Sequence, residues 1–237
     1  MNVELIAHTR IANNFMENTI AGMSEGQMVA FTAIRTCYSA NKPTEILKKE
    51  GEKYVWKEAT DGEGGTDADR LFRHIVRSGH TSTLEHITFT FAIEGISRAC
   101  LAQLTRHRVG FSYSVQSQRY VKFGSDDKSG GFDHVMPQSV KKNPVAVAAY
   151  AFAMGVIQQT YNELREEGVP AEDARMVLPN AATCNLVMTA NLRALLDFYS
   201  KRRKGRGAQW EIADLAEKLR EEVIAVEPWT ERFFKEA

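Results

Sequence analysis

A short stretch of strict alternation, residues 87–93 (ITFTFAI), most constrains how this chain can fold. Apolar residues alternate there with small or polar ones, and β-branched and aromatic types dominate, which indicates a strand with one buried face. Elsewhere helix and strand patterns are mixed, and no unit of about 20 to 50 residues repeats, which excludes solenoids and propellers. We therefore predict one α+β domain over residues 1–237, with a central, mostly antiparallel sheet flanked by helices.

Local start and stop signals predict where the helices lie. Ser24 and Gln27 have the spacing of a capping box at the start of a helix. Thr66 can cap a second helix, and a third opens at Pro144 and ends before Gly168. The other expected elements are strands at residues 3–9, 120–123 and 183–189, helices at residues 97–107, 191–203 and 209–226, a short helix carrying Arg175, and a surface loop at residues 50–65.

Charge and cysteine content exclude several classes of protein. Thirty basic residues balance thirty acidic ones, so no global field attracts nucleic acid or anionic lipid, and any anion site must be local. No segment approaches the roughly 18 apolar residues of a spanning helix, and the start lacks an apolar leader, so we expect a cytoplasmic protein with no membrane partner. Cys37, Cys100 and Cys184 show no CxxC spacing and have apolar neighbours, so we expect three buried thiols.

A group of histidines raises the question of a metal site. His74, His80 and His86, together with Glu85, are of the types that bind zinc. Their spacing matches no compact zinc motif, so we predict no metal site. His86, at the start of a strand, is expected to be a hydrogen-bonded structural residue.

Residues 106–119, RHRVGFSYSVQSQR, crowd cations and hydroxyls into one stretch with aromatic rings. Arginine offers phosphate a planar fork of donors, and aromatic rings offer faces for stacking, so the segment suits a phosphate attached to a flat ring. A solvated basic loop is the alternative on composition alone. If residues 97–107 are helical, Gln103, Arg106 and His107 share one face, and the Gln103 carboxamide can pair with a pyrimidine edge.

The order of several motifs resembles a known family. AQLTRHR and SYSVQSQRYV are similar to the hallmark of the flavin-dependent thymidylate synthases, and GHTSTLEHITFTF, ARMVLPN, ANLR and GAQWEI follow the family's order along nearly the whole chain. The resemblance implies reductive methylation of dUMP to dTMP, with methylenetetrahydrofolate as carbon donor, FAD as hydride carrier and NADPH as reductant. It also implies a homotetramer with active sites between subunits.

The resemblance implies a set of site residues. Those that match flavin-binding positions are His80, Ser82, Arg106, His107, Arg108, Asn191 and Arg193, the last two from a neighbouring subunit. Those that match dUMP-binding positions are Gln103, Arg106, Val115, Gln116, Ser117, Gln118, Arg119, Arg175 and Arg202.

One arginine near the end of the predicted helix 191–203 resembles the residue that polarises the uracil and helps to ionise its N3. Counting forward from ANLR selects Arg202, whereas counting back from GAQWEI selects Arg203, because the chain has one extra residue between the motifs. We favour Arg202, which follows Asn191 by close to three helical turns. A cation beside the uracil carbonyl stabilises developing negative charge, so no cysteine nucleophile is required.

The sequence departs from the family pattern at three places. Arg108 and Ser117 are separated by eight residues, where the family has seven, so we expect this loop to bulge. Val115 stands where Glu or Gln is usual, and Asp197 replaces a frequent Asn or His.

Two other functions stay open. Val115 and the longer loop are compatible with a degenerate homologue that binds nucleotide and flavin without turnover. A nucleic-acid-binding module could use the RHR and RRKGR segments as phosphate contacts, but the zero net charge argues against nucleic acid as a partner.

Overall fold

The computed structural model describes residues 1–236 of the chain. They form two compact units, each of which is described by itself. The segments of unit 1 are Met1–Asn2, Ala92–His107 and Tyr113–Met188, and those of unit 2 are Val3–Phe91, Arg108–Ser112 and residue 189 onward. The assignment of residues 1–237 to one domain stays a prediction.

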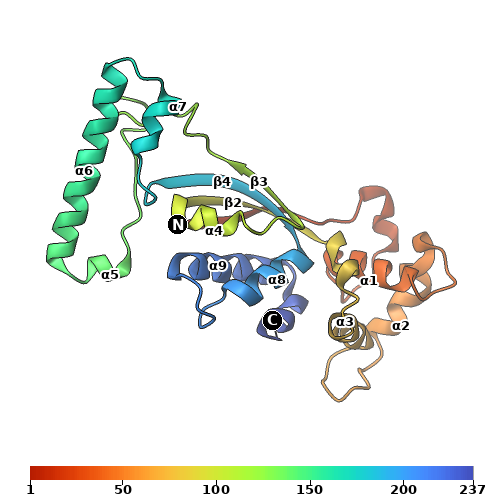
Figure 1. The fold of residues 1–237 in the computed structure, drawn as a ribbon. Helices are drawn as coiled ribbons and strands as arrows, with labels where there is room; N and C mark the ends of the chain where they lie inside the picture. Colours follow the sequence, from red (N-terminus) through yellow and green to blue (C-terminus); the bar gives the residue numbers. More distant parts are fainter. Residues whose placement is uncertain (237) are drawn as a thin grey trace. The chain divides into compact units, whose positions relative to one another are not determined.

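One sheet of four strands is present in the described residues (Figure 1). By residue range, each strand contributes residues to both units. The strands, in the order β1-β2-β4-β3, are β1 (Asn2–His8), β2 (Thr88–Ser97), β4 (Thr183–Asn191) and β3 (Phe111–Val115). Backbone hydrogen bonds at the strand ends join Thr9 to Thr88, Leu192 to Ile87, Arg98 to Ala182, Asn191 to Gly110, and Gln116 to Asn185. Early residues of one strand thus meet late residues of the next, so the prediction of an antiparallel sheet with helices is confirmed.

The period-two pattern of β2 is realised in its burial. Phe89, Phe91 and Ile93 are completely buried, whereas Thr88 is exposed. Two strands of the sheet pass directly into helices. Ser97 ends β2 and caps the following helix through a hydrogen bond from the Cys100 amide, and Asn191 does the same at the end of β4.

Unit 2 contains most of the helices, and their predicted caps are present. Ser24 with Gln27, and Thr66 with Asp69, form capping boxes. The α-helices of the unit are α1 (Glu25–Thr36), α2 (Glu52–Val55), α3 (Asp67–Arg77), α8 (Leu192–Arg202), α9 (Trp210–Val226) and α10 (Glu231–Glu236). Its shorter helical segments are η1 (Asn13–Asn18), η2 (Pro43–Glu45), η3 (Leu47–Gly51), η4 (Thr81–His86) and η6 (Pro228–Thr230). Helices α8 and α9 lie side by side (Figure 1).

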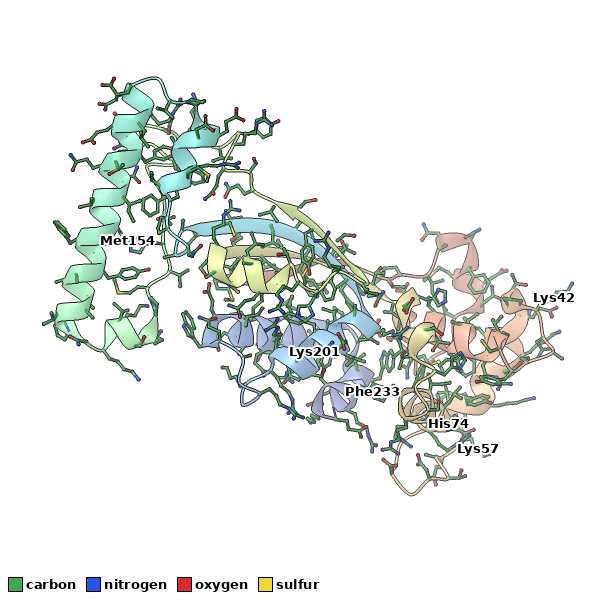
Figure 2. The ribbon with its side chains drawn as sticks, viewed as in Figure 1. Lys42, Lys57, His74, Met154, Lys201 and Phe233 are labelled. Atoms are coloured by element: carbon green, nitrogen blue, oxygen red, sulfur yellow. The ribbon has the colours of Figure 1, made fainter. Side chains whose placement is uncertain are left out.

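Unit 1 is dominated by α6 (Pro144–Glu166), which contacts α5 (Gln138–Lys141) and α7 (Ala171–Ala174) (Figure 1). Its other helical segments are α4 (Arg98–Leu104) and η5 (Arg175–Val177). Pro144 opens α6 and Gly168 follows its end with φ of 82°, as the sequence predicts. Figure 2 shows the side chains along this helix, with Met154 near its middle. Of the residues of α6, Tyr161 alone is fully buried.

Three predicted elements are wrong in position. The expected loop 50–65 begins with η3 and α2, so only its second half is irregular. Residues 120–123 are not a strand: they end a turn at residues 118–120 and continue without regular structure, and the strand of this region is β3. The helix expected over residues 97–107 ends at Leu104, so Arg106 and His107 do not extend its face. Arg175 lies in η5, just after α7.

Glu50 in η3 is a buried carboxylate with several partners. Arg35 Nε donates to its Oε2 at 2.7 Å, Asn41 Nδ2 donates to its Oε1 at 2.8 Å, and the Ser39 hydroxyl donates to the same Oε1. Burial opposes ionisation, but these donors outweigh it and hold the pKa of Glu50 below its ordinary value. This network joins η3 to α1.

Candidate active site

In unit 2, the turn after the RHR triplet lies against the start of α8. Val109 is 89% exposed at its tip. Gly110 has φ of 76°, and its carbonyl accepts a hydrogen bond of 3.1 Å from the Asn191 amide. A Cβ at Gly110 would lie 2.7 Å from both Ala194 Cβ and Asn191 Nδ2, so only glycine fits. The chain thus makes an exposed, tight turn directly after the RHR triplet, and the expected bulge of the longer loop stays a prediction.

One face of α8 continues from this turn toward the two candidate arginines. The Asn191 side chain caps the helix by accepting from the Ala194 amide at 2.8 Å. Phe198 is buried and meets Phe111 edge to face at 6.1 Å. Arg202 is the last residue of α8, so it keeps the helical register of Asn191 and lies on nearly the same face.

The C-terminal turn of α8 is held by charged groups of α9. Arg203 leaves the helical conformation with ψ of 156°, and within residues 1–236 its buried Nε has no hydrogen-bond partner. Lys204 Nζ lies 2.7 Å from an oxygen of Asp214. The Tyr199 hydroxyl donates to Glu217, with its two carboxylate oxygens at 3.0 and 3.1 Å. Burial and this hydrogen bond raise the pKa of Tyr199, so the hydroxyl stays protonated.

Asp197, which replaces a frequent Asn or His of the family pattern, lies on α8. Its Oδ2 is 2.7 Å from Lys201 Nζ one turn later. The Asp197 carboxylate is therefore paired with the Lys201 ammonium group, and a neutral Asn or His at this position would not form this ion pair.

Unit 2 also contains a cavity of about 1000 Å³ lined by residues of η1, α1 and η4. Ile11, Phe15 and Met28 are among its apolar lining, and this volume lies at the upper end of small-molecule sites, roughly 300 to 1000 Å³. The predicted flavin-site residues His80 and Ser82 both line it.

Three more groups at this cavity differ from the expectations. Cys37 is exposed and lines the cavity, so the prediction of a buried thiol is wrong for it and confirmed for the two other cysteines. His86, expected to be structural, is exposed and also lines the cavity. Glu85, considered above only as a metal ligand, also lines it, and its Oε1 lies 2.5 Å from Nη1 of Arg193. His80 Nδ1 is 3.0 Å from the Tyr38 hydroxyl.

In unit 1, Tyr113 orders the backbone of the RHR triplet. Its hydroxyl lies 3.1 Å from the carbonyl oxygen of Leu104 and 2.7 Å from that of His107. Arg106 is exposed, and Gln103 Nε2 donates to the Ala99 carbonyl at 3.4 Å. The expected common helical face of these residues is absent because α4 ends at Leu104.

Also in unit 1, two predicted dUMP-binding residues, Arg119 and Arg175, contact Glu172. Arg119 Nε lies 2.5 Å from Oε2 of Glu172, and Arg175 Nε donates to the Glu172 backbone carbonyl at 2.9 Å. The Ser117 hydroxyl accepts from the Arg119 amide at 3.2 Å. The Arg119 guanidinium lies 5.5 Å from the centre of the Tyr120 ring. No sequence motif indicated Glu172, because its contact with Arg119 joins distant parts of the chain.

The remaining predicted residues of this segment lie beside the sheet. Val115 ends β3, and the Gln116 amide donates to the Asn185 carbonyl at 2.8 Å. The Gln116 carbonyl accepts from Arg98 Nη2 at 3.1 Å. Gln118 is half-buried in the turn that follows.

Two absences complete the description of residues 1–236. No three histidine, cysteine or carboxylate side chains in this range are grouped so that they could hold a metal ion. None of the helices in this range has the length and apolar character needed to cross a membrane.

The sequence of this chain is similar to the sequences of known proteins. A family profile described as thymidylate synthase complementing protein matches residues 19–229. The flavin-dependent thymidylate synthase of Geobacter sulfurreducens is 46% identical over 196 residues, which are 83% of this chain and 76% of that protein. The chain belongs to the flavin-dependent thymidylate synthase family. A second member of the family, from Thermococcus onnurineus, is 44% identical over 80% of this chain and 78% of its own length.

The fold of this flavin-dependent thymidylate synthase family member is also found in a solved structure. The UMP/dUMP methylase PolB of Streptomyces cacaoi, bound with 5-Br dUMP, aligns with a TM-score of 0.73 and covers 99% of this chain and 94% of that one. At 23% identity this likeness shows a shared fold. The match to the family profile includes the RHR turn, α8 and most of the cavity lining.

Proposed function

We propose that this protein converts dUMP to dTMP by reductive methylation, with methylenetetrahydrofolate as carbon donor and NADPH as reductant. The observation that carries the proposal is membership of the flavin-dependent thymidylate synthase family over residues 19–229. The likeness to PolB, a UMP/dUMP methylase, supports a uracil nucleotide as substrate. A cytoplasmic location is part of the same proposal.

The cavity of unit 2 fits a role in holding FAD. Its apolar lining suits a flat ring system, and His80 and Ser82 add polar groups. The ion pair of Arg193 with Glu85 holds a cation next to this lining. We assign flavin contacts to His80, Ser82, Arg106, His107 and Arg108, and to Asn191 and Arg193, the last two of which the family resemblance places in the flavin site of a neighbouring subunit. When bound, FAD supplies the hydride that completes the methyl group.

Arg202 is the group that we assign to the uracil. Its place at the end of α8, in register with the capping residue Asn191, gives the guanidinium a rigid support. A fixed cation beside the uracil carbonyl stabilises negative charge as N3 ionises, and this makes C5 more nucleophilic. Arg203 is the weaker candidate, because it lies outside the helix in an extended backbone conformation and its Nε is buried.

The remaining assigned side chains bind the nucleotide. Arg119 and Arg175 suit the phosphate, because both are cations held beside Glu172. Further contacts to dUMP are assigned to Gln103, Val115, Gln116, Ser117 and Gln118. Cys100 and Cys184 are buried in unit 1 and take no part in this scheme.

The deciding experiment measures flavin binding and tritium release together. The purified protein, loaded with FAD, is mixed with dUMP tritiated at C5, methylenetetrahydrofolate and NADPH. We expect a yellow protein that releases tritium, with release abolished in Arg202→Ala and retained in Arg203→Ala. Bound FAD without release would favour the degenerate homologue. A colourless protein that binds oligonucleotide with steep salt dependence would favour the nucleic-acid module.

We also propose that the protein is a homotetramer and that α6 makes one of its contacts. Val145, Phe152 and Val156 lie on one stripe of this helix and are 78, 75 and 45% exposed. This exposed apolar stripe supports a two-fold contact between α6 helices of two copies. Light scattering should give a smaller particle for Phe152→Glu, and an unchanged mass would contradict the α6 contact.

A further inference from the structure

Glu172 lies at the junction of two arginines that the proposed function assigns to the phosphate of dUMP. Arg119 Nε lies 2.5 Å from Oε2 of the Glu172 carboxylate, and Arg175 Nε donates a hydrogen bond of 2.9 Å to the Glu172 backbone carbonyl oxygen. The two contacts come from one residue in α7, next to η5. Glu172 therefore holds the Nε atoms of both arginines near the same residue.

Contact through Nε leaves most of the hydrogen-bond donors of each guanidinium free for a ligand. An arginine has five N–H donors, and four of them belong to the two Nη atoms. When Nε is occupied, the Nη donors stay available for a phosphate oxygen. The side chains of Arg119 and Glu172 are 56 and 42% exposed, so a ligand from solvent can reach this pair.

Exposed ion pairs by themselves contribute little to stability. The contact of Arg119 with Glu172 is thus poorly explained as a device that holds the fold together. Orientation of a flexible side chain, in contrast, reduces the entropy that is lost when the ligand binds.

We infer that Glu172 is a positioning residue for the phosphate of dUMP. Its carboxylate holds Arg119 by Nε and its backbone carbonyl holds Arg175 by Nε, and this presents the Nη groups of both to the same anion. Side-chain variants of Glu172 change the Arg119 contact alone. The inference rests on the proposed function, which supplies the nucleotide, and adds a residue that touches the arginines and not the substrate.

The test compares dUMP with deoxyuridine, which lacks only the phosphate. Calorimetric titration of the FAD-loaded protein should give about tenfold weaker dUMP binding for Glu172→Ala, with deoxyuridine binding unchanged. Glu172→Gln keeps an oxygen that accepts from Nε, so it should stay within about threefold of the wild type. Asp173→Ala is the matched control, because it removes the same charge from the same turn of α7.

Each result decides between distinct statements. Wild-type dUMP affinity in Glu172→Ala would overturn the inference, and so would an equal loss of deoxyuridine binding. Glu172→Met, which has similar length and no acceptor oxygen, replaces the alanine variant if that one does not fold. If the wild type binds no dUMP, the proposed function fails and the inference fails with it. If the wild type binds dUMP and the Glu172 variants bind it with the same affinity, the inference alone fails.

Discussion

Replacement of Gly110 by alanine should destabilise the protein through two separable effects. The first is conformational, because φ of 76° is the left-handed region, which costs an L-residue about 1 to 2 kcal/mol. The second is steric, because the new Cβ would lie 2.7 Å from Ala194 Cβ and from Asn191 Nδ2. Overpacking of this kind costs about 1 to 3 kcal/mol. The free energy of unfolding should therefore fall by roughly 2 to 5 kcal/mol.

Gly62→Ala is the matched control for this prediction. Gly62 has φ of 78°, and no described atom lies within 4 Å of the position of its Cβ, so only the conformational cost applies. Urea unfolding at neutral pH should show a loss of about 1 to 2 kcal/mol for the control. Equal losses in the two variants would refute the argument from close approach. Displacement of Asn191 should also lower the flavin bound per chain in Gly110→Ala and leave it unchanged in Gly62→Ala.

Three further predictions concern side chains outside the turn. In Glu50→Gln the free energy of unfolding should fall by about 3 kcal/mol at pH 7, because the partners of a buried charge lose their counterpart. Since folding lowers the pKa of Glu50, this difference should shrink as the pH falls below about 4.5, and a constant difference in urea unfolding would contradict it. Tyr199→Phe keeps the aromatic ring but loses its hydrogen bond to the Glu217 carboxylate, so urea unfolding should report a loss of about 1.5 to 3 kcal/mol; no change would mean that the bond is not formed. Cys100→Ala should retain tritium release within about twofold, whereas a folded variant without release would reveal a covalent role.

Helix starts were predictable where a nearby side chain satisfies the first backbone donors. Ser24 and Thr66 accept from residues three positions later, so their spacing carries the whole signal. Pro144 and Gly168 limit α6 in the same local way. The alternation of residues 87–93 likewise predicts β2, because burial of one face is a property of each strand by itself.

Elements whose limits depend on distant partners were not predictable. Helix α4 stops at Leu104, whose carbonyl is bonded by the hydroxyl of Tyr113 in the following strand. The strand near the RHR segment is β3 because it pairs with β4, far along the chain. Cys37 follows the last residue of α1 and lines the cavity, where it is exposed, and its apolar sequence neighbours do not indicate this.

The candidate site shows the same division. Motif order predicted His80 and Ser82 together, and both line the cavity. It also predicted Arg119 and Arg175 as partners of one ligand. The carboxylate of Glu172 that joins them was not predictable, because no periodicity or spacing links it to Arg119.

The direct passage of β4 into α8 has a consequence for how Arg202 is aimed. No connecting residue separates Asn191 from Leu192, so a slip of β4 by one residue would turn the helix by about 100°. The direction of the guanidinium is thus encoded in the pairing of strands, and an insertion between Met188 and Leu192 would misdirect it. Between β4 and α9, the chain can change length without this penalty beyond the last turn of α8, in the glycine-containing residues 203–209. An extra residue placed there lengthens the link to α9 and leaves Arg202 where the strand sets it.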